Sequence, residues 1–173
     1  MKKLRSILDQ MMRIFNASVF AILTLLTVWQ VLTRYILNNP STWSEELASY
    51  LFAWVTLLGA AYVFGKREHM NIPVVVDMLS PKLQHYLAIL SEVIIFIFAV
   101  VVLIYGGISI TLLTMGQATS SLPVQMGVFY AAIPISGVFT AIYSILNIYD
   151  LIKGNPIGTK PVENKLPVDE RQA

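Results

Sequence analysis

The sequence predicts an all-α integral membrane protein with four transmembrane helices, a short amphipathic helix before them, and both termini in the cytoplasm. Three observations carry this prediction: the low charge content, the gaps between the charges, and the distribution of Lys and Arg. Only 13% of the 173 residues are charged and the mean hydropathy is +0.68, whereas about a quarter of a soluble domain is charged. The chain therefore has too little polar sequence for a separate soluble domain.

Charge-free runs give the number of crossings. These runs span residues 14–33, 47–65 and 93–149. A membrane-spanning helix needs about 20 predominantly apolar residues, so the first two runs each fit one crossing and the third fits two around a short turn. The crossings are expected at about 14–37, 43–65, 87–115 and 124–152.

The first half of the chain is expected to begin with the amphipathic helix. In residues 2–13, apolar side chains recur at helical spacing between charged ones, which is typical of a helix lying at the membrane surface. The first crossing then ends at Asn38-Asn39-Pro40. The second begins after Thr42, where Thr42 and Glu45 have the spacing of a capping box.

The second half is expected to hold two longer helices. Ser80-Pro81 is a favourable helix start. A helix from there to Met115 would be about 52 Å long, so its first turns, including Glu92, are expected in the interface. Pro123 opens the fourth crossing, and Pro134 is expected to kink it.

Lys and Arg counts predict the orientation, and the Pro, Gly and mixed charge after residue 152 predict where the membrane domain ends. The N-terminal segment, the 66–86 loop and the C-terminal tail hold 4, 3 and 4 of these residues, whereas the two opposite loops hold only Arg34. The positive-inside rule then places both termini in the cytoplasm. We expect residues 1–152 to form a single membrane domain and 153–173 a flexible cytoplasmic tail.

The absence of Cys, the positions of the two His residues and the placement of the charges argue against several classes of function. There is no Cys, which excludes disulfide frameworks and thiolate sites. The two His residues, His69 and His85, stand in a loop and at a helix start, where they cannot clamp a haem at mid-membrane. The net charge of +2 comes from residues that flank helices, so nucleic acid is not an expected partner. We expect no enzyme activity, and no catalytic, cofactor or metal site, in this chain.

The loop between the first two crossings is the richest polar segment. A structural interpretation explains most of it: Thr42 and Glu45 cap a helix, Tyr35 and Trp43 belong to the aromatic belt, and Arg34 complements a helix dipole. A functional interpretation remains open, in which Arg34, Trp43, Glu45 and Glu46 form a surface that docks another protein.

Small residues recur on two crossings. Ala53, Thr56 and Ala60 share a face of the second, and the fourth repeats small residues at spacing four, a pattern that lets helices approach closely in lipid. Packing within the bundle and packing against a partner chain are both open interpretations. The pairs of the fourth crossing are Gly127 and Ala131, Ala132 and Ser136, and Gly137 and Ala141.

Several motifs together resemble the small, DctQ-like membrane subunit of tripartite ATP-independent periplasmic (TRAP) transporters. The resemblance covers about residues 1–152 and is most specific from Arg34-Tyr35 to Trp43-x-Glu45-Glu46. Further matching positions are Tyr50, Trp54, Gly59-Ala60-Ala61, His69 eight residues before Asp77, Pro123 and Tyr130-x-x-x-Pro134.

The resemblance implies a scaffold in the bacterial cytoplasmic (inner) membrane. Its partners would be a large multi-helix permease subunit that carries the sodium ions, a periplasmic substrate-binding protein and membrane lipid. The substrate would be a carboxylate, with sialic acid and C4-dicarboxylates as candidates. A self-associating four-helix membrane transporter or pore is the alternative, and a haem-bearing redox subunit is a third hypothesis. The candidate interface residues are Arg34, Tyr35, Trp43, Glu45, Glu46, Trp54, Gly59, His69 and Pro134.

Overall fold

The computed structural model describes residues 2–66 and 81–153, most of which are helical. Four helical stretches in these ranges are long and apolar enough to cross a membrane, which confirms the predicted all-α membrane fold. The elements are α1 (Lys2–Tyr35), α2 (Thr42–Lys66), α4 (Pro81–Phe98), the π-helix η1 (Ala99–Gly106), α5 (Gly107–Thr114), α6 (Met126–Tyr130) and α7 (Ala132–Ile152).

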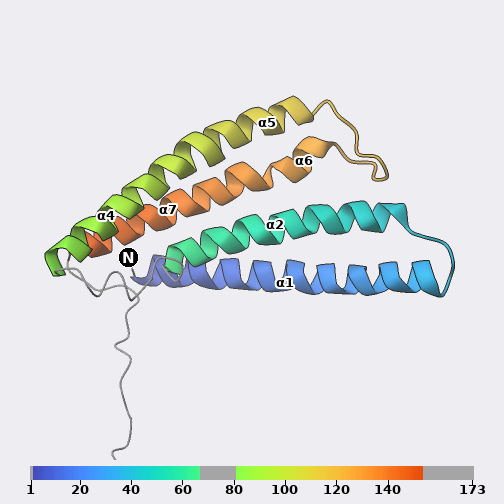
Figure 1. Cartoon of the computed structure of the whole chain (residues 1–173), viewed down its shortest axis with the longest axis horizontal. Coiled ribbons are helices and arrows are strands. Elements are labelled where there is room, and N and C mark those ends of the chain that lie inside the picture. The colour runs from blue at the N-terminus through green and yellow to red at the C-terminus, as the bar shows by residue number, and fades with distance from the viewer. Residues whose placement is uncertain (1, 67–80, 154–173) are drawn as a thin grey trace, which may run out of the picture.

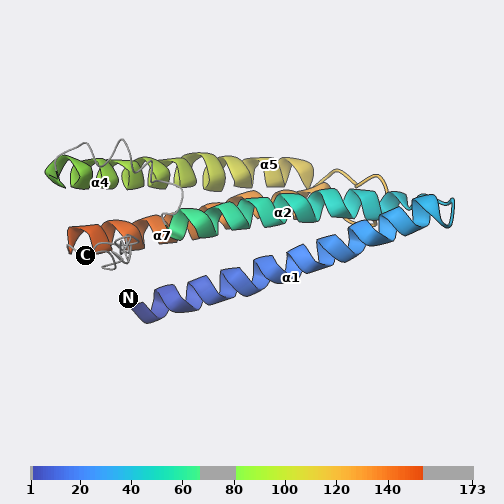
Figure 2. The same cartoon turned by 60° about the horizontal axis from the view of Figure 1, so that its bottom comes forward.

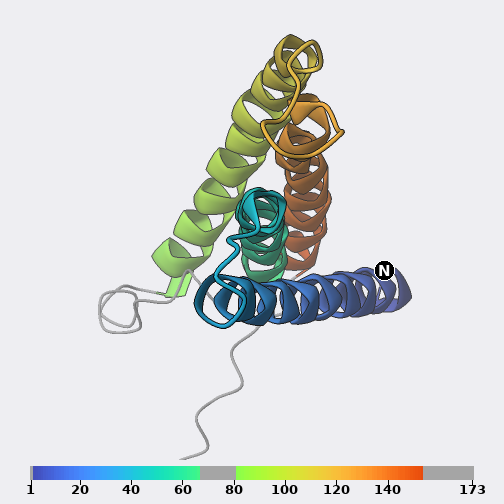
Figure 3. The same cartoon turned by 90° about the vertical axis from the view of Figure 1, so that its right-hand side faces the viewer.

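The helices form two hairpins that lie side by side (Figure 1). α1 and α2 make the first; α4, η1 and α5 make one arm of the second, and α6 and α7 make the other. α2 packs against both α1 and α7, and α7 packs against α4 and η1, so α2 and α7 join the two hairpins. α1 diverges from the other helices toward its N-terminus (Figures 2 and 3).

Two ends of the bundle are distinguished below. The loop end carries the connections 36–41 and 115–125, and the terminal end carries the start of α1 and the ends of α2 and α7 (Figure 1). Which of these ends faces the cytoplasm stays a prediction from the charge distribution.

α1 is one unbroken helix of 34 residues, about 51 Å long at 1.5 Å per residue. The expected separate amphipathic helix over residues 2–13 is therefore corrected to the first turns of α1. The physical reason is that no Pro or Gly interrupts residues 2–35. In addition, Arg5 and Asp9 bond to α7, and Arg5 also to α2, which holds this segment on the bundle.

The end of α1 is closed by backbone hydrogen bonds. The amides of Leu37 and Asn39 donate to the carbonyls of Leu32 and Thr33, with N···O distances of 3.1 and 3.0 Å. Asn38 between them has a φ of 48°, the left-handed conformation that Asn tolerates better than most residues. Pro40 follows, so the chain turns here as the sequence predicts.

The third crossing is continuous from α4 through η1 to α5, because Phe98 and Gly107 both keep helical dihedral angles. Its predicted extent to about Met115 is confirmed, whereas the π-helical segment Ala99–Gly106 was not expected. The crossing lies close to α7. A Cβ added at Gly107 would lie 2.9 Å from Pro134, and one added at Gly137 would lie 2.6 Å from the Cβ of Leu103.

The fourth crossing is interrupted at Ala131, between α6 and α7. Pro134 explains the interruption, because it has no N–H to donate to the carbonyl of Tyr130 and its ring crowds that carbonyl. The break falls one turn before the proline, and the predicted kink of this crossing stays a prediction. The crossing begins at Met126 rather than Pro123, because the Met126 amide donates to the Gln117 carbonyl at 2.9 Å and closes the preceding loop.

A small core joins α1, α2 and α7 near the terminal end. Met12, Leu58, Ala61 and Tyr143 are fully buried there. Gly65 allows the close approach of α2 to α7, since an added Cβ would lie 2.5 Å from the Tyr143 ring. The small residues Ala132, Ser136 and Gly137 are also buried in the bundle, which favours the intramolecular interpretation of the fourth crossing.

Some predictions fall outside the described residues. They concern His69, the remainder of the 67–80 loop, and the tail from residue 154 onward. The limits of the membrane domain therefore stay a prediction.

Candidate partner-binding surface at the loop end

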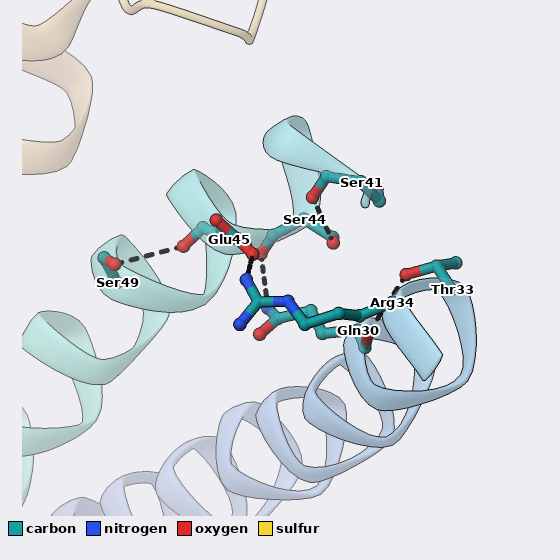
Figure 4. Close-up of polar contacts among 7 residues, drawn as sticks. All are labelled: Gln30, Thr33, Arg34, Ser41, Ser44, Glu45 and Ser49. Carbon is teal, nitrogen blue, oxygen red and sulfur yellow. Dashed lines mark hydrogen bonds and ion pairs between the residues drawn. The ribbon is translucent and has the colours of Figure 1, made fainter. Parts of the chain in front are cut away.

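The connection between α1 and α2 is held by a set of short polar contacts (Figure 4). Arg34 near the end of α1 forms an ion pair with Glu45 in the first turn of α2. Gln30 Nε2 donates to the Ser44 carbonyl at 2.7 Å, and Ser44 Oγ donates to the Ser41 carbonyl at 2.8 Å. Ser44 is completely buried, so this connection has a defined conformation.

The expected capping box at Thr42 and Glu45 is not formed. α2 begins at Thr42, which makes Ser41 the capping position, yet the Ser41 hydroxyl oxygen has no hydrogen-bond partner. The Glu45 carboxylate instead binds Arg34. An opposite charge competes successfully for this carboxylate, because a charge-assisted pair is stronger than a bond to a neutral backbone amide.

Glu46 joins the first hairpin to the loop of the second. Its carboxylate accepts hydrogen bonds from the backbone amides of Ser120 and Ser121 at 2.9 and 2.6 Å and from the Tyr50 hydroxyl at 3.1 Å. The Tyr50 ring also stacks on Phe129, with centroids 3.8 Å apart and planes 6° apart. The two connections therefore form one continuous polar surface at the loop end.

The 115–125 connection is itself ordered by backbone pairing. Ala118 and Gln125 form an isolated antiparallel bridge, and the Thr119 amide donates to the Val124 carbonyl at 3.1 Å. The buried Thr119 hydroxyl donates to the carbonyls of Leu122 and Val124. This pairing holds the amides of Ser120 and Ser121 where Glu46 reaches them.

Aromatic and charged side chains are exposed around this surface. Tyr35 and Trp43 are 73% and 44% exposed, and the Arg34 and Glu45 side chains are about half exposed despite their ion pair. These predicted residues thus lie together at the loop end with Glu46. Their role in binding a partner stays a prediction.

Three other candidate residues are partly buried against neighbouring helices. Trp54 packs against the core and lies 6.4 Å from the Phe15 ring. Gly59 faces α1, where an added Cβ would meet Asn16 at 3.8 Å, and Pro134 contacts Gly107 across the third and fourth crossings. These positions serve packing within the chain, and whether they also influence a partner interface stays a prediction.

A buried polar cluster between α4 and α7 was not anticipated from the sequence. Glu92, expected in the interface, is only 2% exposed. Its carboxylate accepts from the Ser144 hydroxyl at 3.0 Å and from Asn147 Nδ2 at 3.1 Å, and Ser144 also donates to the Glu92 carbonyl at 2.7 Å. The sequence signal is Ser144 and Asn147, which stand three residues apart and therefore on one helix face.

A second unanticipated network ties α1 to the terminal end. Arg5 donates to the Gly65 carbonyl at 2.7 Å and forms an ion pair with Asp150 at 3.2 Å. The Tyr143 hydroxyl donates to Asp9 at 2.8 Å. These residues hold the diverging end of α1 on α2 and α7.

The long helices present an apolar exterior. Large exposed hydrophobic side chains occur on every crossing, including Leu25, Phe52, Val101 and Ile145. Ala53 and Thr56, the small residues of α2, are also exposed. Across residues 2–66 and 81–153 no group of three or more His, Cys, Asp or Glu side chains could hold a metal ion. This architecture defines a four-helix integral membrane protein whose exterior is made for lipid or for other membrane helices.

The chain belongs to the DctQ family. Residues 23–154 match the model of the family described as tripartite ATP-independent periplasmic transporters, DctQ component. A sialic acid TRAP transporter small permease protein, SiaQ of Vibrio cholerae, is 32% identical over 159 residues, which cover 88% of each chain. A TRAP transporter small permease protein of Haemophilus influenzae, itself described as putative, is 27% identical over 88% of this chain and 94% of its own.

The resemblance expected from the sequence is thereby confirmed. The chain is a TRAP transporter small permease subunit, a multi-pass protein of the bacterial cytoplasmic membrane. The relatives are transporter components rather than enzymes, which supports the expectation that this chain is not an enzyme. A large permease partner is also implied by a longer relative. SiaT of Haemophilus influenzae, a sialic acid TRAP transporter permease protein, is 26% identical to this chain. The matched region covers 80% of this chain but only 21% of SiaT.

Proposed function

We propose that this subunit is a scaffold that packs against the large permease and enlarges its static part, while the loop end helps to dock a periplasmic substrate-binding protein. The observation that carries the proposal is the division of the surface. The long helices are apolar outside, and polar contacts between helices are found at the loop end and the terminal end and in the buried Glu92 cluster between α4 and α7. The buried polar side chains of that cluster bond to one another, and the apolar exterior suits packing against membrane helices of a partner.

The match to SiaT supports the association with a large permease. About a fifth of that polypeptide aligns with four-fifths of this chain, so a region similar to this chain is covalently part of a larger permease there. A separate small subunit would make the same association without the covalent link. The exposed small residues Ala53 and Thr56 on α2 offer a place for close helix approach.

The docking role rests on the loop end. The 11-to-1 distribution of Lys and Arg predicts that this end faces the periplasm. Glu46 and the Arg34–Glu45 pair fix both connections in place, and a pre-organised surface loses less conformational freedom when a partner binds.

The substrate of the complete transporter is proposed to be a carboxylate imported with sodium ions. The names of the relatives specify sialic acid for SiaQ and SiaT and C4-dicarboxylate for a small permease protein of Vibrio cholerae that is 28% identical over 47% of this chain. Sodium would bind in the large subunit, and this chain would not contact the substrate.

Reconstitution tests the proposal. This chain, the large permease of the same system and the binding protein would be placed in liposomes with radiolabelled sialic acid or succinate outside and an inward sodium gradient. Uptake is expected only with all three proteins, and a tag on this chain should recover the large permease from detergent extracts. Uptake by this chain alone would instead support the self-associating pore, and failure to recover the permease would overturn the scaffold role.

A double variant separates docking from assembly. Glu45→Ala with Glu46→Ala should lower uptake while the large permease is still recovered. The control is Lys153→Ala, an exposed change at the terminal end, which should leave uptake unchanged. Normal uptake in the double variant would restrict these acids to a structural role.

A further inference from the structure

A polar pocket opens between α1 and α2 at the terminal end, far from the loop-end surface. Its volume is about 380 Å³, and its lining includes Arg5, Asp9, Arg13, Tyr62 and Lys66. Three cations and one carboxylate thus face one cavity. Its lining comes from the first turns of α1 and the last turns of α2, and this part of α1 diverges from the other helices (Figure 2).

The sequence sets the depth of this pocket in the membrane. Arg13 is the last charge before the charge-free run 14–33, and Lys66 is the first charge after the charge-free run 47–65. Because those runs cross the hydrocarbon, both cations stand at its edge, at the level of the lipid headgroups. Long cationic side chains at helix ends reach toward this level.

The charges of the pocket favour a negative ligand. Arg5 is engaged by Asp150 and by the Gly65 carbonyl, and Asp9 accepts a hydrogen bond from Tyr143. Among residues 2–66 and 81–153, setting Asp9 and Asp150 against Arg5, Arg13 and Lys66 leaves one net positive charge. Arg13 is exposed, and Lys66 lies 4.6 Å from the centre of the Tyr62 ring, which holds its ammonium group beside the cavity. Arg and Lys both bind phosphate oxygens.

Apolar side chains border the pocket on the membrane side. Ala17 and Phe20 of α1 stand four and seven residues after Arg13 and therefore on the same helix face. Both are exposed, and Phe20 is 60% exposed. A ligand with a phosphate at the headgroup level and hydrocarbon chains below would contact both parts. A soluble phosphate would use only the first.

We propose that this pocket binds the phosphodiester of a membrane phospholipid, with Arg13 and Lys66 as the phosphate ligands and the acyl chains along Ala17 and Phe20. Arg5 adds positive charge while holding α1 in place. Asp9 disfavours a second negative charge in the pocket, so a headgroup with a single phosphodiester fits better than a polyanionic one. Basic pockets between transmembrane helices are known to hold lipid headgroups.

Native mass spectrometry of the full chain released from detergent micelles tests this proposal. The chain would be titrated with phosphatidylglycerol, and separately with glycerol 3-phosphate. Arg13→Gln with Lys66→Gln should weaken phosphatidylglycerol binding at least tenfold. The matched control is Lys3→Gln with Lys153→Gln, which removes the same charge at the same end. Lys153 also lies over a Tyr ring, at 4.5 Å, and the control should change binding less than twofold.

Three outcomes would overturn the proposal. Equal weakening in both double variants would mean a general charge effect, and glycerol 3-phosphate bound as tightly as the lipid would mean a site for free anions. If the wild-type chain binds neither ligand, the pocket is not a phospholipid site, and an acidic group of another protein becomes the expected ligand. If the double variant elutes as an aggregate, the exposed single variant Arg13→Gln is compared with Lys3→Gln instead. Arg13→Gln should then weaken phosphatidylglycerol binding threefold or more.

Discussion

Replacing Glu92 by Ala is expected to destabilise the association of α4 with α7. The carboxylate is 2% exposed and accepts hydrogen bonds from Ser144 and Asn147. The change leaves Asn147 Nδ2 without this acceptor in a place where Asn147 Oδ1 already has no partner. Ser144 is less affected, because its hydroxyl keeps the bond to the backbone carbonyl of residue 92.

The magnitude follows from the two lost side-chain bonds. A hydrogen bond to a charged group contributes about 1.5 kcal/mol or more in soluble proteins, which gives about 3 kcal/mol for two. Interhelical hydrogen bonds in membranes average only about 0.6 kcal/mol, which gives about 1 kcal/mol. We therefore expect Glu92→Ala to lower the free energy of unfolding by about 1–3 kcal/mol.

Glu92→Gln separates the hydrogen bonds from the charge. Its amide oxygen can accept from Asn147, and its amide nitrogen can donate to the Ser144 oxygen, so the expected loss is below about 1 kcal/mol. The assay is equilibrium unfolding in mixed micelles with increasing SDS, followed by tryptophan fluorescence. Leu90→Ala, an exposed change on the same helix, is the control and should behave like the wild type. A loss for Glu92→Gln as large as that for Glu92→Ala would refute this reasoning.

Three further changes test other contacts. Gly65→Leu should lower the yield of monodisperse protein, since even a Cβ would lie 2.5 Å from the Tyr143 ring; normal yield and thermal stability would contradict this packing. Glu46→Gln should increase protease cleavage in the 115–125 connection, because the carboxylate that holds two backbone amides becomes a weaker acceptor; unchanged cleavage would mean that the connection is ordered without it. Exchange of Arg34 and Glu45, as Arg34→Glu with Glu45→Arg, should change the free energy of unfolding by less than about 1 kcal/mol, since exposed ion pairs contribute little; a larger loss measured in SDS would contradict this.

The crossings could be predicted because lipid imposes a local rule on sequence. A charge within the hydrocarbon is costly, so the gaps 14–33, 47–65 and 93–149 reveal the helices without any knowledge of their packing. The turn after α1 is equally local, since Asn38 adopts the left-handed conformation just before Pro40. The same rule does not reveal that Glu92 is buried between α4 and α7, and its depth in the interface stays a prediction.

The contacts between helices could not be predicted in the same way. Glu46 lies 74 and 75 positions from Ser120 and Ser121, and neither serine carries a distinctive signal of its own. The capping box at Thr42 and Glu45 was wrong for a related reason: local spacing identifies a suitable acceptor, but the ion pair with Arg34 depends on how α1 and α2 meet.

The bonds of Arg5 have a consequence for the order in which the chain is synthesised. Its two partners lie 60 and 145 positions later in the sequence, so Arg5 leaves the ribosome long before either of them. The Gly65 carbonyl becomes available when the first hairpin is complete, and Asp150 only when the last helix is nearly finished. In a nascent chain that stops short of α7, the Arg5 guanidinium at the membrane surface would have the Gly65 carbonyl but lack Asp150. Membrane-bound quality-control proteases could recognise this difference between the incomplete and the complete chain.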